Sequence, residues 1–507
     1  MNSYHSTRSR AVSCTAKEAI RTGIAPDGGL FVSDALGSEK LDVTGLAEQS
    51  YADIANSVLQ LLLPDYTADE IAACVHEAYD GTFASSEVTP LVPLVGHEAE
   101  EGRQPFVLEL FHGPTSAFKD VALQMLPRLM ARTGSASDTP AESIMIVTAT
   151  SGDTGKAALA GFADAPGTGI TVFYPEGKVS RVQELQMTTQ TGGNVSVCGV
   201  RGNFDDAQSA VKRIFADREL AERLAERGVV LSSANSINVG RLVPQVVYYF
   251  AAYAQLLRAG AIEAGDEVEF CVPTGNFGDV LAGYYAKLLG LPVAKLIVAS
   301  DKNNVLYDFL TTGVYDRKRP FFTTISPSMD ILISSNLERM LYYLSDGDCE
   351  LVASLMEQLA TEGRYEVPAE LLARIQEVFA CGWANEDEVR AAIGSCWRDH
   401  RYVIDPHTAC GYHVLEQFPA APAARVRVLL STASPYKFPR AVAESLGLDV
   451  PADDFACMEV LAKATGTTPP VQLATLQQAA VLHDDVVDVD GMASYVEHAC
   501  HAKLGQR

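Results

Sequence analysis

The stretch Phe111-His-Gly-Pro-Thr-Ser-Ala-Phe-Lys-Asp120 decides how the rest of the chain is interpreted, because it joins a tight turn to a helix with a lysine at its start. Glycine followed by proline at Gly113 favours the turn. Thr115 or Ser116 is expected to cap a helix that runs over residues 117–130. In open α/β sheets, ligands bind at such turns, outside the carboxyl ends of the strands.

Lys119 lies in the first turn of that expected helix, where the helix dipole disfavours a positive charge. Apolar Ala117 and Phe118 precede it directly. Both features lower the pKa of the amine, and an amine needs a low pKa to attack an aldehyde and form a Schiff base. By its local context alone, the same lysine also fits a solvated surface residue.

Short apolar, β-branched runs recur along the chain and predict strands at 144–148, 170–174, 195–199, 268–272, 294–299 and 425–430. Runs that are apolar almost throughout are typical of strands covered on both faces. Helical patterns such as 205–228 and 241–260 lie between them. This alternation predicts an α/β fold whose sheets are mostly parallel, with helices on both faces.

The 507 residues are more than one core normally holds and predict two or three domains. Residues 1–95, rich in helix formers and poor in strands, are expected to form an N-terminal domain. Two α/β domains are expected at 96–265 and 266–507. Inside the second, residues 336–400 are expected to form an insertion of successive helices with no strand.

Composition limits the possible partners. The formal net charge of −25 repels nucleic acid and anionic membrane surfaces. The N-terminus lacks the apolar core of a secretory signal, and the most apolar stretch, 280–299, is broken by two lysines and a proline, so no membrane span is expected. Ten cysteines without C-x-x-C or zinc spacing predict reduced thiols in a cytoplasmic protein and no metal site. The oligomeric state stays open.

Two further glycine-bearing turns follow predicted strands. Thr148-Ala-Thr-Ser-Gly-Asp-Thr-Gly-Lys-Ala-Ala158 is rich in hydroxyls and opens a helix, so its N–H groups suit a carboxylate or phosphate. Pro273-Thr-Gly-Asn-Phe-Gly-Asp279 forms a loop whose N–H groups suit a phosphate. It matches neither nucleotide-binding glycine motif. Asp279 would repel a phosphate, so it is expected to cap its helix or orient the loop.

Four other residues have two interpretations each. Arg241 suits bidentate phosphate recognition but equally an ordinary surface or salt-bridged arginine. Thr432 follows a predicted strand, where a hydroxyl usually makes a turn bond. Lys156 could contact a ligand, although a solvated helix lysine is the simpler expectation. His112 could assist proton transfer, but a hydrogen bond that stabilises its turn is favoured, so it is left out of the catalytic set.

Together these segments resemble the threonine synthase family. The signature around Lys119 and the Gly275-Asn-Phe-Gly-Asp279 loop are the specific parts of the resemblance, which spans about residues 10–440. Further motifs similar to those of the family, in the family's order, are Gly23-Ile-Ala-Pro-Asp-Gly-Gly-Leu-Phe31, Thr150-Ser-Gly-Asp-Thr-Gly155, Asn235-Ser-Ile-Asn-Val-Gly-Arg241 and Ser431-Thr-Ala-Ser-Pro-Tyr-Lys-Phe438.

The resemblance implies the fold of the tryptophan synthase β-subunit group, in which pyridoxal 5′-phosphate lies between two mostly parallel, doubly wound sheet domains. It implies that Lys119 holds this cofactor as a Schiff base and that Thr432 meets the pyridine nitrogen. The cofactor phosphate loop would be formed by Gly275, Asn276, Phe277 and Asp279.

The resemblance also implies the substrate, O-phospho-L-homoserine, which reacts with water to give L-threonine and phosphate. Ser151, Asp153 and Thr154 would lie near the substrate carboxylate or a cofactor oxygen. The substrate phosphate would be contacted by Asn235, Ser236 and Arg241. Two alternatives stay open: another lyase of this cofactor group, such as a threonine or serine dehydratase, and a non-catalytic threonine synthase-like protein.

Overall fold

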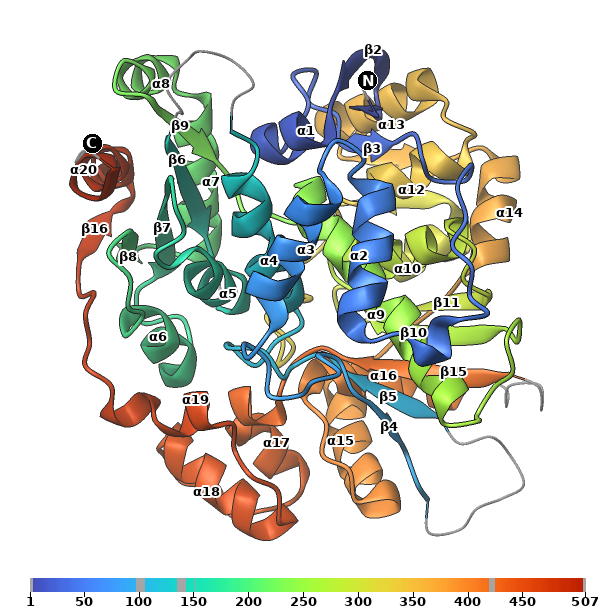
Figure 1. Cartoon of the computed structure of the whole chain (residues 1–507). Coiled ribbons are helices and arrows are strands. Elements are labelled where there is room, and N and C mark those ends of the chain that lie inside the picture. The colour runs from blue at the N-terminus through green and yellow to red at the C-terminus, as the bar shows by residue number, and fades with distance from the viewer. Residues whose placement is uncertain (1–2, 97–104, 135–142, 151, 419–424, 505–507) are drawn as a thin grey trace.

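The computed structural model of the chain describes residues 3–96, 105–134, 143–150, 152–418 and 425–504. It contains two parallel-sheet units and an N-terminal unit (Figure 1). A continuous apolar core joins all three, from Tyr4 through Ile146 to Phe270. The predicted α/β class with mostly parallel sheets and an additional N-terminal part is therefore confirmed.

The larger sheet has six strands, and its two faces meet different helices. Because side chains alternate along a strand, Phe270 packs into the core formed with α9 (Val239–Arg258) and α10 (Gly278–Leu288), whereas the neighbouring Cys271 packs into the core on the side of α16 (Pro406–Gln417). Only the edge strand β4 is antiparallel to its neighbour. In spatial order the strands are β14 (Phe379–Trp383), β11 (Val293–Ser300), β10 (Val268–Pro273), β15 (Val426–Ser431), β5 (Phe106–Glu109) and β4 (Leu91–Pro93).

The smaller sheet has five strands, all parallel. Ile146 on one face packs into the main core with α5 (Asp153–Phe162), and Val147 on the other face packs against α7 (Phe204–Ala216) and α20 (Met492–Leu504). In spatial order the strands are β16 (Val486–Asp488), β8 (Val195–Arg201), β7 (Thr168–Pro175), β6 (Ser143–Ala149) and β9 (Val229–Ser232).

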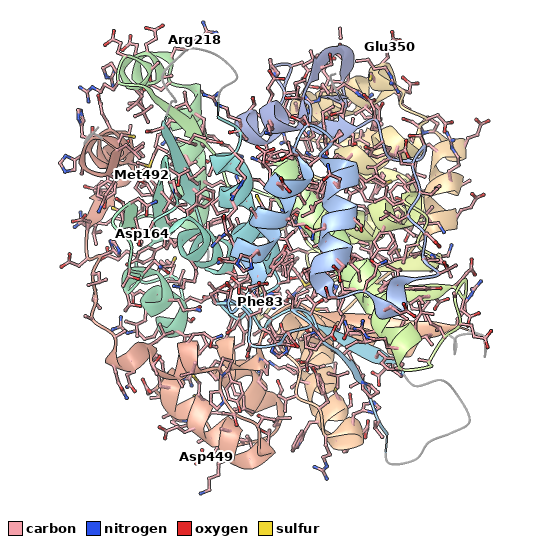
Figure 2. The ribbon with its side chains drawn as sticks, viewed as in Figure 1. Phe83, Asp164, Arg218, Glu350, Asp449 and Met492 are labelled. Carbon is pink, nitrogen blue, oxygen red and sulfur yellow. The ribbon has the colours of Figure 1, made fainter. Side chains whose placement is uncertain are left out.

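Neither sheet is made from one continuous segment. β5, inside the predicted 96–265 domain, pairs with β15 near the other end of the chain. Near the C-terminus, β16 pairs with β8, and α20 packs against the same sheet. Met492 of α20 is fully buried there (Figure 2). The predicted domain boundaries stay a prediction, but each α/β unit takes strands from both sides of the boundary at 265.

The expectation that residues 336–400 contain no strand is wrong. β13 (Arg364–Glu366) pairs with β12 (Val314–Asp316), and β14 extends the six-stranded sheet beside β11. No turn residue marks β14, because it begins directly where α14 (Ala369–Val378) ends. The other helices of this interval are α12 (Leu337–Leu344), α13 (Cys349–Glu362) and α15 (Glu386–His400).

The helix predicted over 205–228 is two helices. Asp217 has an extended backbone between α7 and α8 (Arg218–Ala225), and its side chain accepts a hydrogen bond from the Leu220 N–H, which starts the second helix. The remaining helices are α1 (Ala16–Thr22), η1 (Leu46–Glu48), α2 (Tyr51–Leu62), α3 (Ala68–Tyr79), α4 (Lys119–Ala131), α6 (Arg181–Thr188), α11 (Val305–Thr312), η2 (Pro435–Lys437), α17 (Pro439–Ser445), α18 (Asp454–Thr465), α19 (Val471–Ala474), η3 (Leu476–Gln478) and η4 (Val489–Gly491). No helix in these described ranges combines the length and the apolar character that crossing a lipid bilayer requires.

The N-terminal unit holds a small antiparallel sheet, in the order β2 (Ser9–Cys14), β1 (Tyr4–Ser6) and β3 (Phe31–Ser33). Its hydroxyls reach into the helix that begins with Lys119, since Tyr66 and Tyr79 donate to backbone carbonyls of α4. Arg339 of α12 is fully buried and donates to the carbonyls of Phe31 and Ile237. The N-terminal unit is thus bonded to the segments that carry the candidate site.

We expect the Arg339→Met variant to lose about 3 kcal/mol of unfolding free energy or more, because it leaves buried carbonyl groups without donors. Urea unfolding of the full chain measures the loss. The control is Arg223→Ala, which breaks an ion pair with Glu497 at the surface and should cost about 1 kcal/mol at most. Equal losses in both variants would contradict the central position given to Arg339.

Candidate active site

The turn before Lys119 is held by Asp120, not by the expected cap. The N-cap of α4 is Phe118, which makes no side-chain cap bond. Instead, the Thr115 N–H and hydroxyl donate to the buried Asp120 carboxylate, at 2.8 and 2.6 Å. The predicted cap by Thr115 or Ser116 is therefore wrong, because the carboxylate draws the turn's donors to itself. Gly113 must lack a side chain, since a Cβ there would lie 2.5 Å from Asp120.

Lys119 is 7% exposed, so the alternative of a solvated surface lysine is wrong. Its Nζ donates to the Ser328 hydroxyl at 3.1 Å and lies 3.9 Å from Asp153 Oδ2. Burial lowers the pKa of Lys119 to about 8. The charge of Asp153 opposes this shift, and those of Arg241 and Lys437 reinforce it. The expected low pKa is confirmed, and burial is its main cause.

The second turn brings Asp153 and Thr154 to the start of α5, while Ser151 lies outside the described residues. Gly152 has φ +148°, and a Cβ there would lie 2.3 Å from the Gln183 amide nitrogen, so this position requires glycine. Lys156 makes a polar contact of 2.5 Å with the Gln190 side chain.

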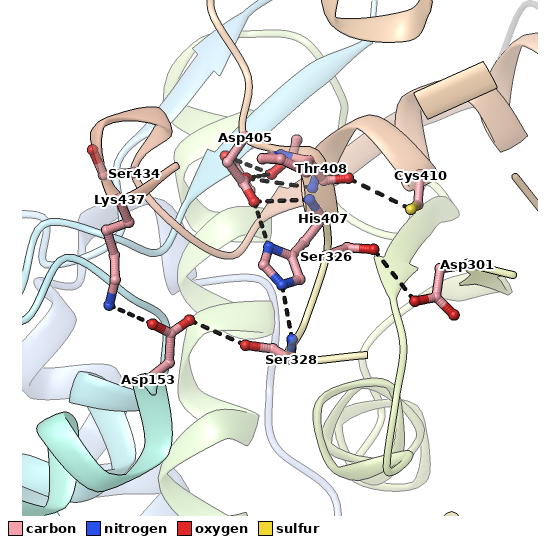
Figure 3. Close-up of polar contacts among 12 residues, drawn as sticks. Asp153, Asp301, Ser326, Ser328, Asp405, His407, Thr408, Cys410, Ser434 and Lys437 are labelled. Carbon is pink, nitrogen blue, oxygen red and sulfur yellow. Dashed lines mark hydrogen bonds and ion pairs between the residues drawn. The ribbon is translucent and has the colours of Figure 1, made fainter. Parts of the chain in front are cut away.

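Asp153 is buried between two amines. Lys437 Nζ is 2.7 Å from its Oδ1, and the Ser328 hydroxyl donates to its Oδ2 at 3.1 Å (Figure 3). Burial raises the pKa of this carboxyl, but the charges of Lys437 and Lys119 outweigh that effect and hold it well below its usual range. Asp153 therefore carries a full negative charge at neutral pH.

The predicted phosphate loop joins β10 to α10. Phe277 has φ +66°, a left-handed conformation that is uncommon for a non-glycine residue. Its fully buried ring packs against Phe379 and holds the bend. The Asn276 amide donates to the Ser236 hydroxyl, so the loop and the predicted Ser236 are in direct contact.

Asp279 is buried behind the loop, where it accepts hydrogen bonds from Tyr248 and Tyr249 of α9, at 2.6 and 3.0 Å. Burial raises its pKa to about 6. The expectation that Asp279 orients the loop agrees with these contacts, because the bonds fasten the start of α10 to α9.

Two buried donors near this loop lack a partner among the residues that the structure describes: Arg241 Nε and Asn336 Nδ2. Arg241 is 5% exposed, which rules out a surface arginine, and burial lowers its pKa to about 10. Asn336 Nδ2 would lie 3.4 Å from a Cβ on Gly278, the first residue of α10. Unsatisfied donors at a helix N-terminus fit an anionic phosphate. Asn235, in contrast, is exposed.

Thr432 is attached to the Lys119 turn through the backbone, since its carbonyl accepts from the Phe118 N–H at 2.8 Å. The side chain of His112 pairs with Glu109 at 2.6 Å, which agrees with the turn-stabilising role expected of it.

Sequence reasoning missed Ser328 and the pair that holds it. The Ser328 N–H donates to His407 Nε2 at 3.1 Å, and the other ring nitrogen of His407 is 2.7 Å from Asp405 (Figure 3). Asp405 followed by proline is visible in the sequence only as a helix start. Ser328 lies in a loop without periodicity, which gives no signal.

Comparison with known proteins identifies the family. Residues 84–432 match the family described as "Pyridoxal-phosphate dependent enzyme", residues 3–79 match "Threonine synthase N terminus", and residues 408–488 match "Threonine synthase, C-terminal". The chain belongs to the threonine synthase family. The predicted family and its cofactor, pyridoxal phosphate, are thereby confirmed.

Similar proteins and solved structures agree with this family assignment. The chain is 38% identical to threonine synthase of Pseudomonas aeruginosa, over 87% of this chain and 89% of that protein. It is 38% identical to human threonine synthase-like 1, over 91% of this chain and 62% of that protein, so it spans less than two thirds of that relative's length. The PLP-bound threonine synthase structure from Brucella melitensis is 37% identical with a TM-score of 0.85, covering 98% of this chain and 99% of that one. The yeast threonine synthase structure is 33% identical with a TM-score of 0.87, covering 100% and 99%.

We expect Asn336→Ala to weaken the affinity of the cofactor-free chain for pyridoxal 5′-phosphate about tenfold, the value of one buried hydrogen bond. Titration of the chain with the cofactor, followed by absorbance, measures this. Asn56→Ala is the matched control, because Asn56 of α2 also has an unpaired buried amide atom but lies in the N-terminal unit. An unchanged affinity in Asn336→Ala would exclude this residue from the phosphate site.

Proposed function

We propose that the chain is a threonine synthase that converts O-phospho-L-homoserine and water to L-threonine and phosphate. The observation that carries the proposal is one buried amine, Lys119 Nζ, close to an anionic carboxylate and beside a loop with unsatisfied phosphate donors. An amine of pKa about 8 can exchange protons near neutral pH.

The cofactor would be held at both ends. Lys119 would attach it covalently, and the loop of Gly275, Asn276 and Phe277 would receive its phosphate, with Asp279 fastening the loop to α9. Thr432 would offer a neutral hydroxyl to the pyridine nitrogen, which leaves that nitrogen unprotonated. When bound, pyridoxal phosphate supplies an electron sink for negative charge on the substrate α-carbon.

Protons would be moved by Lys119. With the substrate bound, the Lys119 Nζ would take the proton from the α-carbon and return protons at later steps. Its hydrogen bond to Ser328 keeps the amine aimed into the site. A second proton must then leave Cβ so that phosphate can depart from Cγ. Water must finally add at Cβ while Cγ gains a proton, so the site has to admit water and release phosphate.

The substrate's two anionic groups need different partners. Thr154 at the start of α5 suits the carboxylate, because helix N–H groups favour anions. Asp153 is anionic, so it suits the cofactor oxygen or an amine better than it suits the substrate carboxylate. Ser236 and Arg241 are proposed for the substrate phosphate, with Asn235 at the exposed edge. A cavity of about 680 Å³ reaches Lys437 and Pro327 and would give access for this substrate.

Two alternatives to threonine synthase are a dehydratase and a non-catalytic protein. The buried Arg241 with an unpaired Nε favours a phosphorylated substrate over threonine or serine. The matches to both threonine synthase terminal segments point in the same direction. Lys119, the Gly275 loop and Arg241 are all present, which a non-catalytic relative would not need. As expected from the cysteine content, we place the protein in the cytoplasm.

We expect borohydride reduction of the cofactor-loaded protein, followed by peptide mapping, to find the label on Lys119. The half-buried Lys156 and the buried Lys437 are internal controls in the same digest. Lys119→Ala should lose both the yellow colour near 410–420 nm and turnover. Label on either other lysine would overturn the assignment of the cofactor lysine.

We expect the purified protein to release phosphate from O-phospho-L-homoserine and to release little ammonia from threonine. Parallel assays of both products separate the two enzyme candidates. Ammonia as the main product would support the dehydratase. A protein that binds no cofactor and forms neither product would support the non-catalytic alternative.

A further inference from the structure

A second buried lysine, Lys437, lies at the candidate site. It ends η2, the short helix that follows β15, and its side chain is fully buried. Its Nζ lies 2.7 Å from Asp153 Oδ1 and donates to the Thr115 carbonyl at 2.9 Å. Figure 3 shows the amine pointing at the Asp153 carboxylate. A lysine buried this completely needs a charged partner, and Asp153 is that partner.

Asp153 is shared between the two lysines, but unequally. Lys437 is in direct contact with Oδ1, whereas Lys119 lies 3.9 Å from Oδ2 and reaches it mainly through the Ser328 hydroxyl. In a buried site, a carboxylate without its own counter-ion favours the protonated form of a nearby amine. Lys437 therefore offsets part of the negative charge of Asp153, which still acts on Lys119.

The hydroxyl between them is fixed in place. Ser328 is held through its backbone N–H by His407, whose ring is anchored by Asp405 (Figure 3). The backbone position of Ser328, between Lys119 and Asp153, is thus fixed by the fold.

We propose that Lys437 is a positioning residue, the permanent counter-ion of Asp153. By offsetting the charge of this carboxylate, it allows the amine of Lys119 to give up its proton more readily. This inference rests on the proposed role of Lys119 as the cofactor lysine. Lys437 itself forms no bond with the cofactor or the substrate in this proposal.

The sign of the effect follows from the charges around Lys119. Asp153 of α5 and Asp120 of α4 raise the pKa of its amine, and Arg241 of α9 and Lys437 of η2 lower it. Asp279 of α10 also interacts electrostatically with Lys119. Removing Lys437 takes away one cation and leaves Asp153 unbalanced. Both changes act in one direction, so the amine of Lys119 should hold its proton to higher pH.

The test measures the amine directly in the full-length, cofactor-free chain. A limiting amount of acetic anhydride is added at each pH, and mass spectrometry quantifies acetylation of Lys119, because only the neutral amine reacts. We expect a labelling midpoint near pH 8 for the unchanged chain. In Lys437→Met the midpoint should rise by about one unit or more.

Three further variants make the result specific. Lys437→Arg keeps the charge and should hold the midpoint near that of the unchanged chain. Asp153→Asn removes the carboxylate and should lower the midpoint, and it keeps the proposal testable if Lys437→Met does not fold. Lys178→Met is the matched control, since Lys178 lines the outer part of the same cavity and is exposed. It should change nothing.

The proposal fails if folded Lys437→Met keeps the original midpoint, or if Asp153→Asn leaves it unmoved. Circular dichroism establishes folding. The readout needs neither cofactor nor substrate, so it is independent of the proposed reaction. A shifted midpoint in a protein that releases no phosphate from phosphohomoserine would uphold the charge pairing and reject threonine synthase activity. An unshifted midpoint in an active enzyme would reject the charge pairing and uphold threonine synthase activity.

Discussion

The structure depends on one buried charge balance between its two α/β units. Asp153 starts a helix of the five-stranded unit, whereas Lys119 follows β5 and Lys437 follows β15 of the six-stranded unit. An isolated carboxylate at this depth would cost several kcal/mol. The two units must therefore pack so that the two lysines of one lie beside the carboxylate of the other. This requirement brings the carboxyl ends of both sheets together at a single crevice.

The crevice is shaped by backbone that only certain residues allow. Gly113 leaves room for Asp120, Gly152 leaves room for Gln183, and Phe277 adopts a left-handed bend that its buried ring stabilises. Of these three positions only Phe277 holds an uncommon backbone conformation for its residue type, and its burial offsets that cost. The loops are thus preorganised by packing behind them, so that the groups that would hold a phosphate need little rearrangement to receive it.

The sequence allowed the parts of the site that are local in the chain to be predicted. Lys119, the Gly275 loop and Arg241 each belong to a strand–turn–helix pattern, and such patterns are read from neighbouring residues. Ser328 and His407 were missed because they meet across 79 residues of chain, in a loop and at a helix start that look ordinary. β14 was missed because it follows a helix without a turn residue, so only its pairing with β11 defines it as a strand.

The N-terminal unit is tied to the candidate site through Arg339. Arg339 donates to the Phe31 carbonyl of β3, to the Ile237 carbonyl before α9 and to the Asn336 side chain. Asn336 in turn donates its N–H to the carbonyl of Asn276 in the proposed phosphate loop. One buried guanidinium thus connects the first strands of the chain to the loop at the start of α10. Its two carbonyl partners come from segments about 200 residues apart along the sequence, and both lose this donor if α12 moves away. The proposed phosphate loop is consequently supported from outside its own sheet, and the N-terminal unit is a structural part of the candidate site.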